Sequence, residues 1–288
     1  MRILVTYRQN QGPGQGWETG AALVRALRRL GHDAYPYGTV YQTSQPMADE
    51  APWTPELILF CECGDGDRQY IEFAARSCPM AMWLFDTGRS EDYRAHHKEL
   101  IDHFKPELLF LANLDELAFF PEAHYLPYGV DETQFKPTGA TKFGAAIIGS
   151  AFEKRARFAE AIGVEVRQTQ TGQRYVDEIS KLNVHVHHTN SGGAGLLVMR
   201  YWETLATGTL LLCPSDAAVK RHFKDGVHLV TYSKTRHHSE VRDCQRRLRI
   251  LLSDPCKNLR QRIAEDGRAA ILAAHTYRHR AEEILSYL

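Results

Sequence analysis

Residues 191–214 (SGGAGLLVMRYWETLATGTLLLCP) combine glycines, an arginine and a glutamate at spacings that suit anion binding. The pair Gly192 and Gly193 precedes a predicted helix, whose free amides and partial positive charge attract anions. Glycines at such a position let a phosphate approach the backbone closely. Arg200 and Glu203 lie three residues apart, so they share one helix face. At about 1.5 Å per residue, Glu203 lies about 12 Å beyond the helix start, roughly the span from a diphosphate to a ribose.

The helix that must position these residues is defined by an apolar stripe and a glycine stop. The stripe consists of apolar residues at helical spacing, namely Leu196, Met199, Trp202, Leu205 and Ala206. Gly208 is expected to end the helix, and the apolar run at residues 209–213 predicts a strand buried on both faces. Two interpretations follow. The helix either holds a nucleotide diphosphate and a sugar hydroxyl pair, or is a core helix with one solvated charged edge.

A second strand end, IGSAFEKR at residues 148–155, has the same arrangement. Gly149 and Ser150 follow a predicted strand, and Lys154 and Arg155 lie at the start of the next predicted helix. The free amides of a helix start and nearby basic side chains together suit an anion. Two such helix starts in one basic half of the chain favour an anionic ligand there.

The loop after the first predicted strand is rich in glycine but does not match a dinucleotide fingerprint. Gly12, Gly14 and Gly16 are present, but the third glycine of G-x-G-x-x-G is replaced by Trp17. The second predicted strand also lacks a terminal acidic residue to bind a ribose. We therefore expect a flexible loop that faces a substrate, with Gly14 as its candidate contact.

Asp86 follows a predicted strand and is a candidate for a cleft position. The triplet Asp86-Thr87-Gly88 matches that of aspartic proteases, but it occurs once and in an alternating α/β chain, so that function is not expected. A carboxylate at the carboxyl end of a strand can contact a substrate hydroxyl. The competing interpretation is a helix N-cap or a turn.

Three histidines occur together in the strand sequence HVHH, at positions 185, 187 and 188. His185 and His187 would share a face of the strand, so a metal pair is one interpretation. No glutamate or third ligand follows at a recognisable spacing. We therefore favour histidines that pack in the core or line a cleft, and we expect no metal.

Composition and charge indicate a cytoplasmic globular protein with an anion-binding second half. The 288 residues are 43% hydrophobic and 24% charged, without an apolar run long enough to span a membrane. Residues 1–135 hold 11 Lys+Arg against 20 Asp+Glu, whereas residues 136–288 hold 24 against 15. The acidic first half argues against nucleic-acid binding there. The six cysteines form no C-x-x-C pair, which favours buried free thiols over disulfides or zinc.

Predicted strands and helices alternate along the chain, which is typical of parallel sheets with helices on both faces. In the first half we expect strands at 3–7, 32–37, 57–61, 80–85 and 108–112, and helices at 18–30, 68–77 and 92–104. Residues 124–130 close this half. In the second half we expect strands at 145–148, 164–169, 184–188, 209–213 and 227–232, and helices at 153–161, 175–182, 217–223 and from 239 onward. The polar segment 129–142 is the expected joint between domains 1–135 and 136–288.

Several sequence pieces together resemble the group 1 glycosyltransferases of GT-B fold, and most closely their spore maturation protein B-like branch. These pieces are LPYGVDETQF, IGSAFEKR, YVDEISKLNVHVH, MRYWETLATGTLLL, FKDGVHLVTY and IAEDGRAAILAAHTYRHRAEEIL, which cover most of residues 126–288. The first half resembles the family only in pattern, notably WLFD at residues 83–86. The resemblance implies two doubly wound Rossmann-like domains facing across a cleft, with the final helix crossing back onto the first domain.

The resemblance also implies roles for individual residues. The second domain would hold a nucleotide-sugar donor, with Glu203 at the ribose and Arg155 and Arg200 at the diphosphate. Lys154 is the alternative to Arg155, while Ser150, Gly149 and the pair Gly192 and Gly193 would add backbone contacts to the donor. Group 1 enzymes often carry a glutamate eight residues before the ribose-binding one, and this chain has Gly195 there.

The sequence therefore predicts a metal-independent glycosyltransferase that moves a sugar from a nucleotide sugar such as UDP-glucose, with retention, and needs no further cofactor. Arg200 would stabilise the leaving diphosphate, and Asp86 would contact the acceptor or assist its hydroxyl. The expected acceptor is a glycan, a small molecule or a protein rather than DNA. Three alternatives remain: a catalytically reduced nucleotide-binding protein, motivated by Gly195; a nucleotide-dependent oxidoreductase; and a transferase acting on modified DNA bases.

Overall fold

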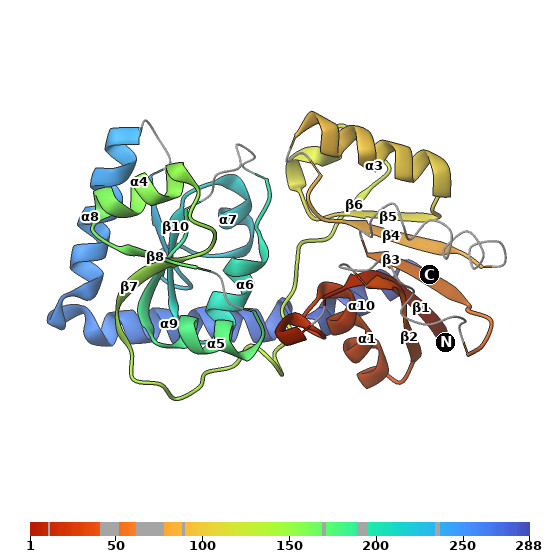
Figure 1. Ribbon diagram of the computed structural model, residues 1–288, viewed down its shortest axis with the longest axis horizontal. Helices are drawn as coiled ribbons and strands as arrows, with labels where there is room; N and C mark the ends of the chain where they lie inside the picture. The colour runs from red at the N-terminus through yellow and green to blue at the C-terminus, as the bar shows by residue number, and fades with distance from the viewer. Residues whose placement is uncertain are drawn as a thin grey trace. The chain divides into compact units, whose positions relative to one another are not determined.

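The computed structural model describes residues 1–10, 12–40, 52–61, 78–87, 90–168, 171–188, 195–233 and 237–288. The chain forms two compact units, each built on a parallel sheet (Figure 1). The first unit contains Met1–Gly129 together with Tyr277–Leu288, and the second contains Val130–Thr276. The helix predicted at 68–77 lies outside the described residues, as does most of the polar loop before residue 55.

The first unit is a six-stranded parallel sheet in the order β2-β1-β3-β4-β5-β6. Its strands are β1 (Arg2–Gln9), β2 (Asp33–Val40), β3 (Leu57–Cys61), β4 (Met80–Leu84), β5 (Leu108–Leu111) and β6 (His124–Tyr125). Its α-helices in the described part are α1 (Thr19–Arg29), α3 (Glu91–Phe104) and α10 (Tyr277–Leu285). Strands β3 and β4 are buried along their whole length, as expected of continuous apolar runs covered on both faces.

The second unit is a five-stranded parallel sheet in the order β11-β10-β9-β7-β8. Its strands are β7 (Phe143–Ile148), β8 (Glu165–Arg167), β9 (Leu182–Val186), β10 (Leu210–Pro214) and β11 (Val230–Tyr232). Its helices are α4 (Glu153–Ile162), α5 (Gln173–Ser180), α6 (Met199–Ala206), α7 (Ala217–His222), α8 (His237–Leu252) and α9 (Lys257–Ala274). Helix α4 packs against α8, and α6 packs against α9 (Figure 1).

The strand order of the second sheet creates one point where ligands are expected. From β7 the chain passes first to β8 on one side and then to β9 on the other. The loops that leave the carboxyl ends of β7 and β9 therefore run to opposite sides of the sheet, the arrangement at which open α/β sheets generally bind ligands. The residues that follow these two strands, Gly149 and His187, thus lie where open α/β sheets bind ligands.

Three of the differences from the sequence-based description have a clear local cause in the structure. Strand β6 takes up only the first two residues of the closing segment 124–130. Beyond it, Arg280 bonds the backbone carbonyl oxygens: its Nε lies 2.7 Å from the Pro127 oxygen, and its Nη2 lies 3.1 Å from the Tyr128 oxygen. Pro127 also has no N–H to donate. Strand β11 begins at Val230, since the residues before it form a turn closed by Gly226 N–H donating to the Leu229 oxygen at 2.8 Å.

The third difference concerns α6, which begins only at Met199. Leu196 was predicted to lie on its apolar stripe but precedes the helix, because the indole Nε1 of Trp202 binds the Leu197 oxygen at 3.3 Å and holds this stretch as a loop. The end of α6 is as predicted: Gly208 follows it with a left-handed φ of 68°. Glu203 is thus about 6 Å from the helix start instead of about 12 Å.

Helix α10 belongs to the first unit although it ends the chain. It packs against α1, and the hydroxyls of Thr19 and Tyr277 lie 3.0 Å apart. Tyr277, Ala281 and Ile284 are buried in the core of the first unit. Within the described residues, no helix has the length and hydropathy needed to cross a bilayer.

Candidate functional site

Two guanidinium groups approach the backbone of Gly149, directly after β7. A Cβ atom placed on Gly149 would lie 2.6 Å from Nη1 of Arg155 and 3.5 Å from Cζ of Arg200. Only a glycine leaves both groups in their places. Arg155 comes from α4 and Arg200 from α6, so the two helices that follow β7 and β9 each supply one positive charge.

Arg155 is buried because of its place in α4. It lies three, four and seven residues before Phe158, Ala159 and Ile162, which form the buried face of that helix. Its Nη1 donates to the Ser150 oxygen at 2.6 Å, and its Nη2 donates to the His188 oxygen at 3.2 Å.

The guanidinium of Arg155 thereby bridges the segments after β7 and β9. Its Nε is buried without a hydrogen-bond partner in the described part of the chain. Burial and then the charge of Arg200 lower the pKa of Arg155. A buried cation with a second cation beside it favours a bound anion.

The neighbouring Lys154 is exposed at the surface of α4. The structure therefore brings Arg155, and not Lys154, to Gly149. Ser150 is also exposed and contributes its backbone oxygen to Arg155. The sequence could have separated the two basic residues, because Arg155 lies nearer than Lys154 to the centre of the apolar stripe of α4.

A carboxylate lies one turn along α6 from Arg200. Glu203 is 6% exposed, and its Oε2 accepts a hydrogen bond from the Tyr175 hydroxyl at 2.9 Å. Burial raises the pKa of Glu203 to about 7, against the opposing effects of the Tyr175 hydrogen bond and the charge of Arg200. Glu203 is thus a poorly hydrated acceptor close to the guanidinium pair. Sequence reasoning missed Tyr175, which lies in a different helix, α5, and carries no motif.

The histidines of HVHH contact residues next to this site. The ring of His185 is fully buried: its Nδ1 lies 2.6 Å from Oγ1 of Thr204, and its Nε2 accepts the Ile148 N–H at 3.3 Å. The ring of His187 packs edge-on against Tyr201, and the ring of His188 stacks on Phe158. Because both ring nitrogens of His185 are engaged, it cannot pair with His187 on a metal. Within the described ranges, no three His, Cys, Asp or Glu residues are grouped as a metal site.

The remaining predicted contacts lie elsewhere or cannot be described. Asp86 and Gly14 belong to the first unit, where Asp86 is half-buried after β4 and Gly14 is buried in the 3-10 helix Gly12–Gly14. Asp86 is not the N-cap of α3, because Ser90 takes that place and accepts the Tyr93 N–H at 3.3 Å. The glycine pair 192–193 lies outside the described residues.

The residue after Asp86 is fixed by buried hydrogen bonds. Oγ1 of Thr87 lies 2.7 Å from Nδ1 of His97, and Nδ2 of Asn113 donates to the Thr87 oxygen at 2.7 Å. The side chain of Phe85, on the other side, stacks on Tyr128. Asp86 therefore has a rigid backbone and a partly exposed carboxylate, which suits contact with a substrate hydroxyl.

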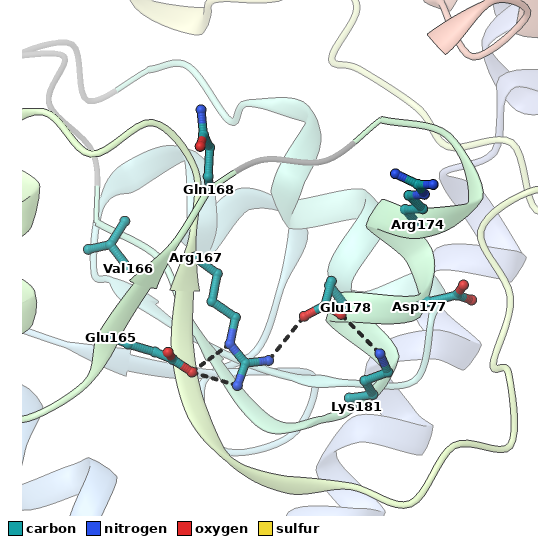
Figure 2. Close-up of a pocket in the computed structure, with 8 residues that line it drawn as sticks. All are labelled: Glu165, Val166, Arg167, Gln168, Arg174, Asp177, Glu178 and Lys181. Carbon is teal, nitrogen blue, oxygen red and sulfur yellow. Dashed lines mark hydrogen bonds and ion pairs between the residues drawn. The ribbon is translucent and has the colours of Figure 1, made fainter. Parts of the chain in front are cut away.

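A groove of about 520 Å³ lies at the edge strand β8, between that strand and α5 (Figure 2). Its central cation, Arg167, points toward α5 and pairs with Glu178 at 3.2 Å and with Glu165 at 2.6 Å (Figure 2). Lys181 pairs with Glu178 at 2.9 Å. Since these charges neutralise one another, the groove offers an anion less than the guanidinium pair at Gly149 does, and we place the candidate site at Gly149.

Comparison with known proteins identifies the family and the fold of the chain. The sequence profile of the family described as glycosyl transferase-like matches residues 134–286. No curated protein matches the chain in sequence. Among solved structures, HepE from Anabaena in complex with UDP-glucose is 11% identical, with a TM-score of 0.70 and 100% of both chains covered.

Two other solved structures resemble the chain to a similar degree. Sucrose-phosphate synthase from Thermosynechococcus elongatus has a TM-score of 0.64 at 10% identity, over 100% of this chain and 98% of its own. An alpha-glucosyltransferase in complex with UDP and a 13-mer DNA has a TM-score of 0.69 at 11% identity, over 100% of this chain and 99% of its own. These likenesses confirm the predicted fold of two parallel-sheet α/β domains.

The profile match includes the second half of the chain with Gly149, Arg155, Arg200 and Glu203. It confirms the predicted group 1 relationship and an enzyme of the glycosyltransferase class, whereas the spore maturation protein B-like branch stays a prediction. The chain belongs to the glycosyl transferase-like family, and its fold is that of the GT-B glycosyltransferases.

Proposed function

We propose that this protein transfers a sugar from a UDP-sugar to an acceptor hydroxyl. The observation that carries the proposal is the approach of Arg155 and Arg200 to Gly149, at the carboxyl ends of β7 and β9. Two cations at such a position suit a diphosphate. The solved structures of HepE and of the alpha-glucosyltransferase, which share the fold, contain UDP-glucose and UDP respectively.

The donor would lie with its diphosphate against Gly149 and its ribose against Glu203. Arg200 can donate two parallel hydrogen bonds to phosphate oxygens. Arg155, whose Nη1 and Nη2 already donate to backbone oxygens, would contribute mainly its positive charge. Glu203 would accept hydrogen bonds from the ribose hydroxyls, and Tyr175 would orient its carboxylate through the hydroxyl bond to Oε2. The half-buried start of α6 places Arg200 within one turn of Glu203, so the two groups can contact adjoining parts of one nucleotide.

In the reaction, the bond between the anomeric carbon and the β-phosphate oxygen breaks, and its electron pair stays on the diphosphate. The two guanidinium groups stabilise the charge that develops there. The acceptor oxygen bonds to the anomeric carbon and gives up its proton, for which Asp86 is the proposed acceptor. We propose that the acceptor oxygen attacks on the face from which the diphosphate leaves, so that the anomeric configuration is retained. We also propose that no metal is required, because the arginine pair supplies the positive charge.

A thermal-shift screen of nucleoside diphosphates and their glucose esters tests the donor assignment. A ligand at a hundred times its dissociation constant adds about 2.7 kcal/mol to the free energy of unfolding. UDP and UDP-glucose should raise the melting temperature of the unmodified protein and of Lys154→Ala, but not that of Arg155→Ala. The adjacent exposed lysine is a matched control for loss of one charge. Stabilisation by none of these nucleotides would refute the proposal.

Slow hydrolysis of the donor distinguishes a transferase from a protein that only binds the nucleotide. Gly195, in place of the glutamate often found in group 1 enzymes, motivates the alternative of a catalytically reduced protein. We expect release of glucose from labelled UDP-glucose, at a rate lowered by Arg200→Lys. Tight UDP binding without any glucose release, with a range of acceptor sugars present, would favour the reduced protein.

A second candidate acceptor is a modified DNA base. The alpha-glucosyltransferase that shares the fold was solved with DNA, and the second half of this chain is basic. The acidic first half opposes this alternative, so we propose a glycan, a small molecule or a protein as the acceptor. A gel-shift experiment with duplex DNA at low salt should show no complex; a salt-sensitive complex would favour the DNA acceptor.

A further inference from the structure

The side chain of His185 connects two parts of the proposed donor site. Its Nε2 accepts the N–H of Ile148, the residue before Gly149, at 3.3 Å. Its Nδ1 lies 2.6 Å from Oγ1 of Thr204, the residue after Glu203. One buried ring thus joins the strand end that carries Gly149 to the helix that carries Glu203.

At this end of β7, the ring of His185 takes the place of a backbone hydrogen bond between β7 and β9. The ladder between β7 and β8 continues to Ile148, which is opposite Arg167, and Gly149 N–H donates to the Arg167 oxygen at 3.0 Å. On the other side, the ladder between β7 and β9 reaches only Ala146, opposite His185. Beyond that pair, the imidazole of His185 takes the Ile148 N–H. The position of Gly149 relative to β9 therefore depends on a side chain.

The hydrogen bonds also define the protonation of this ring. A backbone N–H can only donate, so Nε2 must carry a lone pair and the proton must lie on Nδ1. The ring then donates from Nδ1 to the Thr204 hydroxyl. Burial, followed by the charges of Arg200 and Arg155, lowers the pKa of His185 to about 3. The imidazole is therefore neutral near pH 7 and holds both partners in one fixed orientation.

We propose that His185 is a positioning residue that sets the spacing between the diphosphate contact at Gly149 and the ribose contact at Glu203. This inference rests on the proposed function, because it assumes that one UDP moiety spans both contacts. A nucleotide that must reach two subsites at once is sensitive to their separation, because linked contacts strengthen binding only when both can be made together. A ligand that occupies only one subsite does not depend on this spacing.

The test compares UDP with its two halves, uridine and inorganic pyrophosphate. His185→Asn keeps a donor near the Nδ1 position for Thr204 but cannot reach the Ile148 N–H. Thr204→Val removes the other side of the connection with little change of volume. The control is Thr209→Val, which removes another buried hydroxyl of the second unit, one that donates to the Ile179 oxygen at the opposite end of the sheet. Dissociation constants are measured by calorimetry for UDP and by ligand-observed NMR for the weak halves.

We expect the UDP affinity of His185→Asn and of Thr204→Val to fall by about tenfold or more, while the affinities for uridine and pyrophosphate change by less than about threefold. In Thr209→Val, all three affinities should keep their ratios, whatever happens to the melting temperature. If the affinity for uridine or for pyrophosphate falls as much as the affinity for UDP, His185 supports one subsite only and the inference is overturned. Unchanged UDP affinity would also overturn it. If the unmodified protein binds no UDP, the proposed function itself fails, which is a separate result.

Discussion

The guanidinium groups of Arg155 and Arg200 approach the same backbone residue, Gly149, although both are positively charged. Arg155 comes from the helix after β7, and Arg200 from the helix after the β9 loop. Burial and the charge of Arg200 both lower the pKa of Arg155. A site that concentrates like charges in a poorly hydrated place gains free energy when an anion binds. The following predictions depend on this arrangement.

Gly149→Ala should weaken UDP binding by about tenfold or more, because even a displacement of about 1 Å disturbs such contacts. The added methyl would lie 2.6 Å from Nη1 of Arg155, which would have to leave its place beside the Ser150 oxygen. Isothermal titration with UDP measures the effect. Gly163→Ala is the control: a Cβ at that glycine meets no atom within 4 Å, so the variant loses stability through its left-handed φ of 75° without touching either guanidinium group. Equal UDP affinities for the two variants would contradict the placement of the diphosphate.

Glu203→Ala should weaken UDP binding by about 1.5–3 kcal/mol, the range for hydrogen bonds to charged groups. Pyrophosphate affinity should change little, because Glu203 is assigned to the ribose. Competition with a fluorescent UDP analogue provides both values. Asp177→Ala, at a half-buried acidic residue of α5 that bonds Gln173, controls for loss of a negative charge. Loss of pyrophosphate binding together with unchanged uridine binding would contradict the assignment of Glu203 to the ribose.

The buried carboxyl of Glu203 should also make stability depend on pH. Its pKa is raised from 4.5 to about 7, so between these values the folded chain holds a proton that the unfolded chain has released. Its contribution to stability is complete below pH 4.5 and is lost as the pH rises through about 7, by about 3 kcal/mol in total.

Glu203→Gln cannot ionise and should lose this part of the pH dependence. Urea unfolding of both proteins at a series of pH values should show that the variant gains stability relative to the unmodified protein as the pH rises. Parallel curves for the two proteins would show that Glu203 titrates normally in the folded state.

Arg200→Lys should lower kcat for donor hydrolysis more than it raises the donor KM. The lysine keeps a charge but loses the planar group that binds two phosphate oxygens, and the interaction is strongest as the leaving group gains charge. Steady-state kinetics with UDP-glucose and thermal unfolding without ligand are the two measurements. A large loss of stability with normal kcat would instead identify Arg200 as a structural partner of Tyr175 and Glu203.

Removal of metal ions should leave UDP binding and donor hydrolysis intact, because the arginine pair already supplies positive charge. Prolonged EDTA treatment followed by gel filtration tests this expectation with calorimetry and hydrolysis assays. Activity that is lost and then restored by manganese or magnesium, but not by calcium, would show that the diphosphate needs a cation.

The fold was predictable to a large extent because continuous apolar runs and alternation define parallel sheets. Strand β3 has the predicted limits of 57–61, and β7, β9 and β10 differ from prediction by one or two residues at their ends. Helix α6 was predicted too long because apolar spacing continues through its preceding loop, and periodicity does not detect that a Trp202 hydrogen bond holds that loop. The short β6 could not be foreseen either, since it depends on Arg280, far away in the sequence.

The candidate site was predictable in residue type but not in arrangement. Gly149, Arg200 and Glu203 carry local signals of strand end and helix phase. The contact of Tyr175 with Glu203 and the contacts of His185 with Ile148 and Thr204 connect segments that are distant in the chain. A single sequence does not encode such distances in its periodicity. HVHH therefore predicted histidines that pack in the core or line a cleft, but not that both ring nitrogens of His185 bond Ile148 and Thr204.

The return of α10 to the first unit has a consequence for synthesis on the ribosome. Val130–Thr276 emerges as one uninterrupted segment and contains every strand of the second sheet, whereas the first core lacks Tyr277, Ala281 and Ile284 until residues 277–284 have been added. Folding units generally form as soon as their residues are available. The second unit is thus complete in the nascent chain while the first unit still lacks part of its core. The first core is begun first but completed second.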